Sequence, residues 1–253
     1  MEYKLANQIA KRRTKQVFRD RDCTIKLFVK KYSKAAILNE ALNLARVEEG
    51  TDLKIPKLKE VTMVDGRWGL VCEYVEGYSL AELIDNNPEK IDEYMELFVN
   101  IQLEIFSKKV PLLNKIKDKF NRKLTETKLI DDATKFELLH RLDGLKNHSK
   151  LCHGDFIPSN IIITEKGEHY IIDWAHVTRG NEAADSARTY LTLKLNKKDD
   201  LAEKYLDLFC EKTGISKKDV QDWIPIVAAT ELTKGNKKEN EFLSKWINVA
   251  DYE

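Results

Sequence analysis

Residues 151–174 have the sequence LCHGDFIPSNIIITEKGEHYIIDW. Within this stretch, two short apolar runs flank a polar turn around Gly167, a pattern that is typical of a β-hairpin. The two ends of such a hairpin would bring Asp155, Asn160 and Asp173 close together. Two carboxylates and a carboxamide suit Mg²⁺, which takes oxygen ligands and commonly shares its coordination shell with phosphate. The stretch therefore predicts the chemistry of phosphoryl transfer.

Three elements of this stretch occur in a specific order: HGD at 153–155, then Asn160, then IDW at 172–174. Their order and spacing resemble the catalytic and metal-binding segments of the aminoglycoside phosphotransferase and choline kinase family, small-molecule relatives of the protein kinases. An isolated HGD would be weak evidence, whereas the three together are specific. The resemblance implies an α+β, bilobal protein-kinase-like fold with a small antiparallel-sheet N-lobe and a larger, mostly helical C-lobe.

The resemblance also implies a role for each matching residue. By this resemblance, Asp155 would be the catalytic residue, which accepts or orients the proton of the attacking hydroxyl group, while Asn160 and Asp173 would hold Mg²⁺. Taken singly, each of the three could equally cap a turn or end a strand. His153 is expected to brace the loop by hydrogen bonding rather than to move protons. Asp185 is expected to anchor the same loop through hydrogen bonds to its backbone.

The composition limits the classes of partner and compartment. The chain has 253 residues, of which 42% are hydrophobic, so it can bury a substantial core. Its 43 Lys and Arg residues against 42 Asp and Glu residues leave no electrostatic footprint for nucleic acid. No apolar run approaches the ~18 residues of a membrane span, and no signal peptide is apparent. The four cysteines form no CxxC pair, so we expect reduced thiols in a cytoplasmic protein.

Hydrophobic periodicity predicts a small sheet-rich part followed by a larger, mostly helical part. The resemblance implies that these are an N-terminal nucleotide-binding lobe over residues 1–76 and a C-terminal catalytic and substrate-binding lobe over 77–253. In the first part, a helical stripe is expected at Ala36, Ile37, Ala41, Leu42 and Ala45. Strands are expected at 16–18, 24–28, 59–64 and 68–73, with a hairpin turn at Asp65-Gly66. Helices are expected at 80–85, 90–108, 115–129 and 133–146, and again from 182 onward.

Two residues of the first part match the phosphate-binding pair of the family. Lys26 lies in the middle of an apolar strand, and Glu40 lies on the helix that follows. The resemblance implies that Lys26 binds the α- and β-phosphates of the nucleotide and that Glu40 orients it as an ion pair. Two alternatives stay open: Lys26 can be an outward-facing strand residue, and Glu40, which has Glu48 and Glu49 nearby, can belong to a merely solvated helix face.

The segment LVCEYVEG at 70–77 resembles the hinge of the family. There the adenine base would form hydrogen bonds with the carbonyl group of Glu73 and the amide group of Val75. Ile162 and Ile172 are placed to form the floor under the base, although both could be ordinary core residues. The small Cys72 before the hinge leaves both ATP and GTP as candidate phosphate donors.

The chain departs from the kinase pattern in its phosphate loop. Kinases cover the phosphates with a glycine-rich loop, because its backbone amides must approach the oxygens closely, yet the first glycine here is Gly50. The corresponding loop is 10–15. Side chains of Arg12, Arg13 or Thr14 could contact phosphate, the turn could be merely solvated, or nucleotide binding could be loosened.

Near the C-terminal part, two kinds of acceptor site can be envisaged. An acidic pocket that contains Glu182 and Glu231 would favour a polyamine-like sugar, whereas an aromatic cage of Trp174 or Tyr190 would favour a quaternary ammonium group. Both interpretations stay open at the level of sequence, as does the reading of all four as plain surface or core residues.

The sequence therefore predicts a Mg²⁺-dependent kinase that moves the γ-phosphoryl group of ATP or GTP to a hydroxyl group of a small molecule. The alternative from another class is a nucleotide-binding pseudokinase or regulatory protein without transfer activity, which the missing glycine loop favours. A protein kinase is a weaker alternative, because only about a dozen residues separate Asp173 from Asp185, too few for a long activation segment.

Overall fold

The structure is a computed structural model, which describes residues 3–233 and 235–247. Contacts between Cα atoms divide the chain into two units. Unit 1 comprises the residues up to 86 together with 158–176, and unit 2 comprises 87–157 together with the residues from 177 onward. The segment that contains the predicted hairpin thus belongs to unit 1. The division into lobes at residue 76 stays a prediction.

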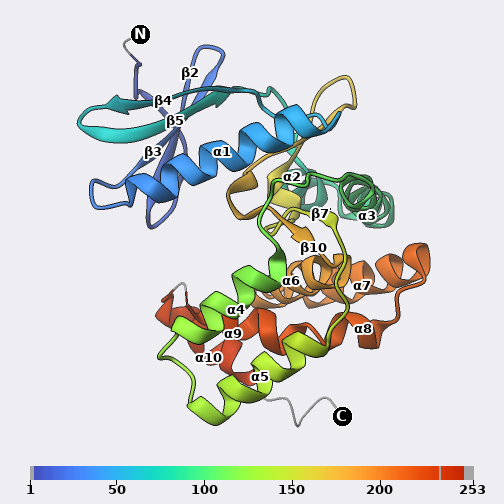
Figure 1. Cartoon of the computed structure of the whole chain (residues 1–253). Coiled ribbons are helices and arrows are strands. Elements are labelled where there is room, and N and C mark those ends of the chain that lie inside the picture. The colour runs from blue at the N-terminus through green and yellow to red at the C-terminus, as the bar shows by residue number, and fades with distance from the viewer. Residues whose placement is uncertain (1–2, 234, 248–253) are drawn as a thin grey trace. The chain divides into compact units, whose positions relative to one another are not determined.

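The sheet of unit 1 is antiparallel throughout, with the strand order β1-β2-β3-β5-β4 (Figure 1). A two-residue connection between β2 and β3 pairs Asp20 with Cys23, and this register places Val17 opposite Lys26. The predicted turn at Asp65-Gly66 is confirmed: both residues have a positive φ, as a type I′ hairpin requires. The strands are β1 (Asn7–Lys11), β2 (Lys15–Asp20), β3 (Cys23–Phe28), β4 (Leu58–Val64) and β5 (Arg67–Glu73).

The two faces of this sheet differ because successive side chains of a strand point to opposite sides. One face carries a core cluster around Ile25, Leu27 and Val71. The other face carries Phe28 and Leu70, which pack against helix α1 (Lys34–Gly50), and Figure 1 shows α1 lying along the sheet. This second face also presents Lys26, which alternates with Ile25 and Leu27.

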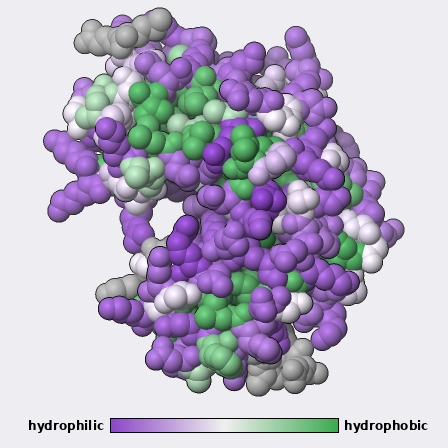
Figure 2. Space-filling model, viewed as in Figure 1, coloured by the Kyte–Doolittle hydropathy of each residue, from purple (hydrophilic) through white to green (hydrophobic). Residues whose placement is uncertain are grey.

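The predicted helical stripe of α1 is only partly correct. The residues that the structure buries are Ile37, Glu40, Ala41, Leu44 and Val47 among others, a spacing of three and four residues that follows one helix face. Ala36 and Leu42, which were expected on that stripe, are exposed. Their outward position leaves apolar surface on α1, and Figure 2 shows hydrophobic residues gathered over this part of unit 1.

The predicted hairpin is confirmed and is extended by a third strand. β8 (Ile161–Ile163) pairs with β9 (His169–Ile171) and also with the short β6 (Tyr78–Ser79). Gly77 precedes β6 with a φ of 156°, and a Cβ atom here would overlap the carbonyl oxygen of Ile163. The remaining elements of unit 1 are α2 (Leu80–Asn86) and the 3₁₀ turns η2 (Pro158–Asn160) and η3 (Trp174–His176).

We expect Gly77→Ala to lower the free energy of unfolding by about 2–4 kcal/mol, because it combines backbone strain with a steric overlap. Gly167→Ala is the matched control, since Gly167 also has a positive φ but has no atom near the position of a Cβ. Gly167→Ala should lower the free energy of unfolding by about 1 kcal/mol. Chemical denaturation of both variants measures the difference, and equal losses would contradict the role of the contact with Ile163.

Unit 2 is mostly helical. Its one described sheet joins β7 (Lys150–Cys152) and β10 (Thr178–Gly180), an antiparallel pair that the sequence analysis did not predict. The first helices end close to the predicted positions. The helical elements are η1 (Pro88–Lys90), α3 (Ile91–Ser107), α4 (Ile116–Glu126), α5 (Asp132–Gly144), α6 (Glu182–Leu195), α7 (Asp199–Thr213), α8 (Lys217–Gln221), α9 (Ile224–Leu232) and α10 (Lys237–Lys245).

None of the described helices combines the length and the apolar character that a membrane crossing would need. The four cysteines are all free, as the absence of paired spacings predicts.

Candidate functional site

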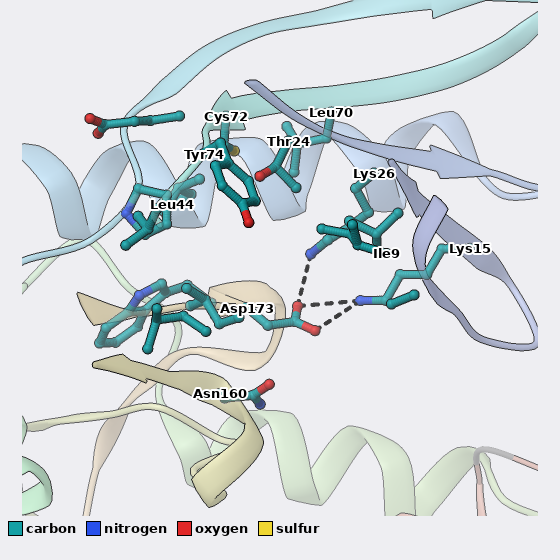
Figure 3. A pocket seen from close by; sticks show the side chains of 18 of the residues that line it. Ile9, Lys15, Thr24, Lys26, Leu44, Leu70, Cys72, Tyr74, Asn160 and Asp173 are labelled. Carbon is teal, nitrogen blue, oxygen red and sulfur yellow. Dashed lines mark hydrogen bonds and ion pairs between the residues drawn. The ribbon is translucent and has the colours of Figure 1, made fainter. Parts of the chain in front are cut away.

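A cavity of about 260 Å³ opens on the α1 side of the sheet in unit 1. Figure 3 shows how the strands supply its upper wall and the segment around Asp173 its lower wall. Because β2, β3 and β5 are in register, alternate residues of each strand share this face. The strand residues that line it include Ile9, Lys15, Val17, Thr24, Lys26, Leu70 and Cys72.

Lys26 lies at the centre of the charged end of this cavity. Its Nζ atom is 2.5 Å from Oε1 of Glu40 and 2.9 Å from Oδ1 of Asp173. The expected ion pair between Lys26 and Glu40 is therefore present. Burial alone would lower the pKa of Lys26, but the carboxylates of Asp173 and Glu40 outweigh it and raise this pKa above the ordinary lysine value.

Asp173 adopts a left-handed backbone conformation with a φ of 64°, which is uncommon for a residue with a Cβ atom and frequent at functional sites. Its carboxylate points toward both Lys26 and Lys15 (Figure 3). Burial would raise the pKa of Asp173, but these two ammonium groups outweigh burial and hold it well below its usual range. Asp173 thus stays an anion at all physiological pH values.

The donor set around Asp173 fits Mg²⁺. Asn160 lines the same cavity. Its backbone carbonyl oxygen accepts a hydrogen bond from the backbone amide of Ile172 at 2.9 Å, which joins the two ends of the hairpin. A carboxylate and a carboxamide are hard oxygen ligands, and Mg²⁺ commonly completes its shell with water and substrate phosphate. Asn160 and Asp173 could therefore hold this ion.

The sequence analysis missed Lys15, the first residue of β2. Its Nζ atom is 3.0 Å from Oδ2 and 3.3 Å from Oδ1 of Asp173. A signal for it was available: the two-residue turn after Asp20 places Val17 opposite Lys26, and Lys15 shares the face of Val17 because side chains alternate along a strand.

The residues expected around the base line the same cavity. Glu73 and Val75 lie at the end of β5 and just beyond it, while Ile162 and Ile172 come from the hairpin. Burial raises the pKa of the Cys72 thiol to about 12, so this side chain is a neutral, weakly polar part of the wall.

In unit 2, Asp155 follows β7 on a loop that α6 holds in place. The carboxylate of Asp185 accepts hydrogen bonds from the amides of His153 and Gly154, at 3.0 Å and 2.7 Å. The amide of Asp155 donates to Nδ1 of His153 at 3.2 Å. The expected bracing roles of Asp185 and His153 are thereby confirmed. Gly154 has a φ of 76°, which glycine adopts without a steric cost.

Asp155 has a cationic partner that the sequence analysis did not identify. Nη2 of Arg188, on α6, is 3.2 Å from Oδ1 of Asp155, and Nη1 contacts Glu231 on α9. Arg188 is only 5% exposed. Burial would lower its pKa, but Glu231 and Asp155 outweigh burial and raise it. Since arginine presents a planar fork of donors, it can hold both carboxylates in fixed positions.

The four residues considered for the acceptor each have a contact within their own unit. Glu231 binds Arg188, and Oε2 of Glu182 is 2.6 Å from Nδ1 of His148. The hydroxyl group of Tyr190 donates to Glu203 at 2.8 Å, and Trp174 is 2% exposed with its Nε1 bonded to the carbonyl oxygen of Ile171. These contacts favour neither the acidic pocket nor the aromatic cage.

Comparisons with known proteins find similarity to phosphotransferases. The model of the phosphotransferase enzyme family matches residues 8–218, whereas no curated protein matches the chain. The solved structure of aminoglycoside phosphotransferase APH(4)-Ia is similar with a TM-score of 0.70 at 10% identity, covering 95% of this chain and 89% of that one. The solved structure of aminoglycoside-3'-phosphotransferase of type VIII is similar with a TM-score of 0.66 at 16% identity, covering 90% of this chain and 93% of that one.

A third similar structure is the choline kinase LicA from Streptococcus pneumoniae, with a TM-score of 0.60 at 17% identity over 95% of this chain and 87% of that one. Other structures of these proteins are an APH(4)-Ia mutant with ADP and hygromycin B, and LicA with AMP. The predicted α+β, protein-kinase-like fold is confirmed by these similarities. Because the family model covers most of the chain, the protein belongs to the phosphotransferase enzyme family.

Proposed function

We propose that the protein is a Mg²⁺-dependent kinase that moves the γ-phosphoryl group of ATP or GTP to a hydroxyl group of a small molecule. The observation that carries this proposal is the pairing of Lys26 with both Glu40 and Asp173 at one end of an apolar-walled cavity. Family membership supports phosphoryl transfer, and the nucleotides in the similar structures support a nucleotide as donor.

The cavity suggests how a nucleotide would bind. The base would lie on a floor formed by Ile162 and Ile172, with hydrogen bonds to the carbonyl group of Glu73 and the amide group of Val75. Lys26 would bind the α- and β-phosphates, held in its extended position by Glu40. An extended lysine that has already lost its rotamer freedom binds phosphate with a smaller entropic cost.

The reacting groups would be positioned by the remaining residues. Mg²⁺, held by Asn160 and Asp173, would neutralise charge that develops on the transferred phosphoryl group. Asp155 would accept or orient the proton of the acceptor hydroxyl group, while Arg188 fixes the direction of its carboxylate. Positioning and charge neutralisation account for most of the catalysis in this reaction class.

Two measurements test this proposal. Calorimetric titration of ATP and GTP, each with and without Mg²⁺, should show Mg²⁺-dependent binding of at least one nucleotide. Incubation with that nucleotide and a panel of hydroxyl compounds, including aminoglycosides and choline, should yield a phosphorylated product by mass spectrometry. We expect Asp155→Ala to reduce transfer about 10²- to 10⁴-fold while nucleotide binding persists.

The outcomes separate the kinase from its alternative. A protein that binds neither nucleotide would contradict the proposal. Binding without transfer to any acceptor, with no difference between the wild type and Asp155→Ala, would favour the nucleotide-binding regulatory protein instead. The four free thiols support the proposed cytoplasmic location, because such thiols persist where the compartment is reducing.

A further inference from the structure

The turn between β1 and β2, which corresponds to the phosphate loop of kinases, contains no glycine. Residues 12–14 are Arg, Arg and Thr, and the turn is closed by a hydrogen bond from the amide of Arg12 to the carbonyl oxygen of Lys15 at 2.8 Å. A turn whose residues all carry a Cβ atom cannot bring several amides as close to phosphate oxygens as a glycine-rich loop does. Positive charge at this position must therefore come from side chains.

Lys15 is the side chain that the fold directs to this task. It begins β2 on the face that carries Val17 and Lys26, and its side chain is 18% exposed. Figure 3 shows the ammonium groups of Lys15 and Lys26 both directed at the carboxylate of Asp173, that of Lys26 from above in this view and that of Lys15 from the right. Lysine offers a compact charge on a flexible stem, so a modest change of rotamer moves the charge several ångströms.

The charges around the cavity show why Lys15 would leave Asp173. Lys26 has two carboxylate partners, Glu40 and Asp173. Among the residues that the structure describes, Asp173 is the one carboxylate within ion-pair distance of Lys15. A divalent cation on Asp173 would remove this attraction and replace it by repulsion between like charges. The phosphates of the nucleotide, which carry several negative charges, would then attract the ammonium group of Lys15.

We propose that Lys15 is a phosphate-binding residue of the nucleotide site. Its ammonium group bonds to Asp173 in the structure and moves to the terminal phosphates when a nucleotide binds. Its side chain supplies the phosphate contacts that backbone amides of a glycine-rich loop supply in protein kinases. This assignment rests on the proposed function, because it requires a nucleotide in the cavity.

The test compares Lys15→Met with the wild type in calorimetric titrations of adenosine, ADP and ATP. Loss of one charge-assisted contact should weaken ATP binding about 10- to 100-fold, and adenosine binding should stay unchanged. Lys15→Arg should restore most of the ATP affinity. Lys11→Met is the matched control: Lys11 is an exposed lysine of β1 in the same hairpin, and its replacement should leave all three affinities unchanged.

Two results would overturn the assignment of Lys15 alone. Lys15→Met could bind ATP as tightly as the wild type, or more tightly, in which case Lys15 would only block the site. Adenosine binding could also fall as much as ATP binding, which would indicate general damage to the cavity. A wild-type protein that binds none of the three compounds would overturn both this assignment and the proposed function, so the two failures are distinguishable.

Discussion

Replacement of Asp173 by asparagine should abolish Mg²⁺-dependent nucleotide binding and reduce phosphoryl transfer at least about a thousand-fold. The carboxylate is the charged member of the proposed metal site, and metal ions supply several kcal/mol of transition-state stabilisation, where about 4 kcal/mol corresponds to a thousand-fold in rate. Asparagine keeps the shape of the side chain and tolerates the left-handed conformation of this position. Titration of ATP with and without Mg²⁺ measures the first effect, and product formation measures the second.

Asp65→Asn is the matched control for this experiment. Asp65 also has a positive φ, but it lies in the exposed turn between β4 and β5. The same chemical change there should leave binding and transfer unaltered. Mg²⁺-dependent binding that survives in Asp173→Asn would contradict the assignment of Asp173 to the metal site.

The same variant should change the response of stability to acid. The pKa of Asp173 is lowered by Lys26 and Lys15 against the effect of burial, so its ionised form stabilises the fold above the unfolded pKa of about 3.9. This contribution is lost as the pH falls toward the folded pKa. The stability advantage of the wild type over Asp173→Asn should therefore be largest near neutral pH and shrink in strong acid.

Much of the fold and part of the site follow from local pattern. The hairpin at 161–171 and the turn at Asp65-Gly66 could be predicted because strand periodicity and turn chemistry act over a few residues. The pair formed by Lys26 and Glu40 was accessible through the family resemblance. By contrast, β7 and β10 are three-residue strands separated by 25 residues, and such short strands are specified by tertiary contacts rather than by their own periodicity.

The charged partners of the candidate site residues were harder to predict than those residues themselves. Arg188 resembles any arginine on a helix until the structure shows that it lies between Asp155 and Glu231. Periodicity also misplaced the apolar stripe of α1: Ala36 and Leu42 are exposed, whereas Glu40, which pairs with Lys26, is buried. A carboxylate that is buried in an ion pair interrupts the hydrophobic pattern, so hydrophobicity alone does not predict such a position.

Replacement of Arg188 by methionine should give the largest loss of stability among the variants considered, about 3–5 kcal/mol. Removal of one partner from a buried ion pair leaves the remaining charges uncompensated, and here Asp155 and Glu231 both lose their cation. Chemical denaturation measures the loss. Lys194→Met is the matched control on α6, because Lys194 pairs with the more exposed carboxylates of Asp199 and Glu203. This replacement should lower the free energy of unfolding by about 1 kcal/mol or less.

The variant also separates positioning from mere structural support. If Arg188 orients Asp155, kcat should fall in Arg188→Met while the dissociation constant of the nucleotide, whose proposed site lies in unit 1, stays close to that of the wild type. The double variant Arg188→Met with Glu231→Gln removes one of the two uncompensated charges, so stability should recover in part. Transfer should not recover with it, because the contact between Arg188 and Asp155 is still absent. Full recovery of both stability and kcat would show that Arg188 serves only to neutralise Glu231.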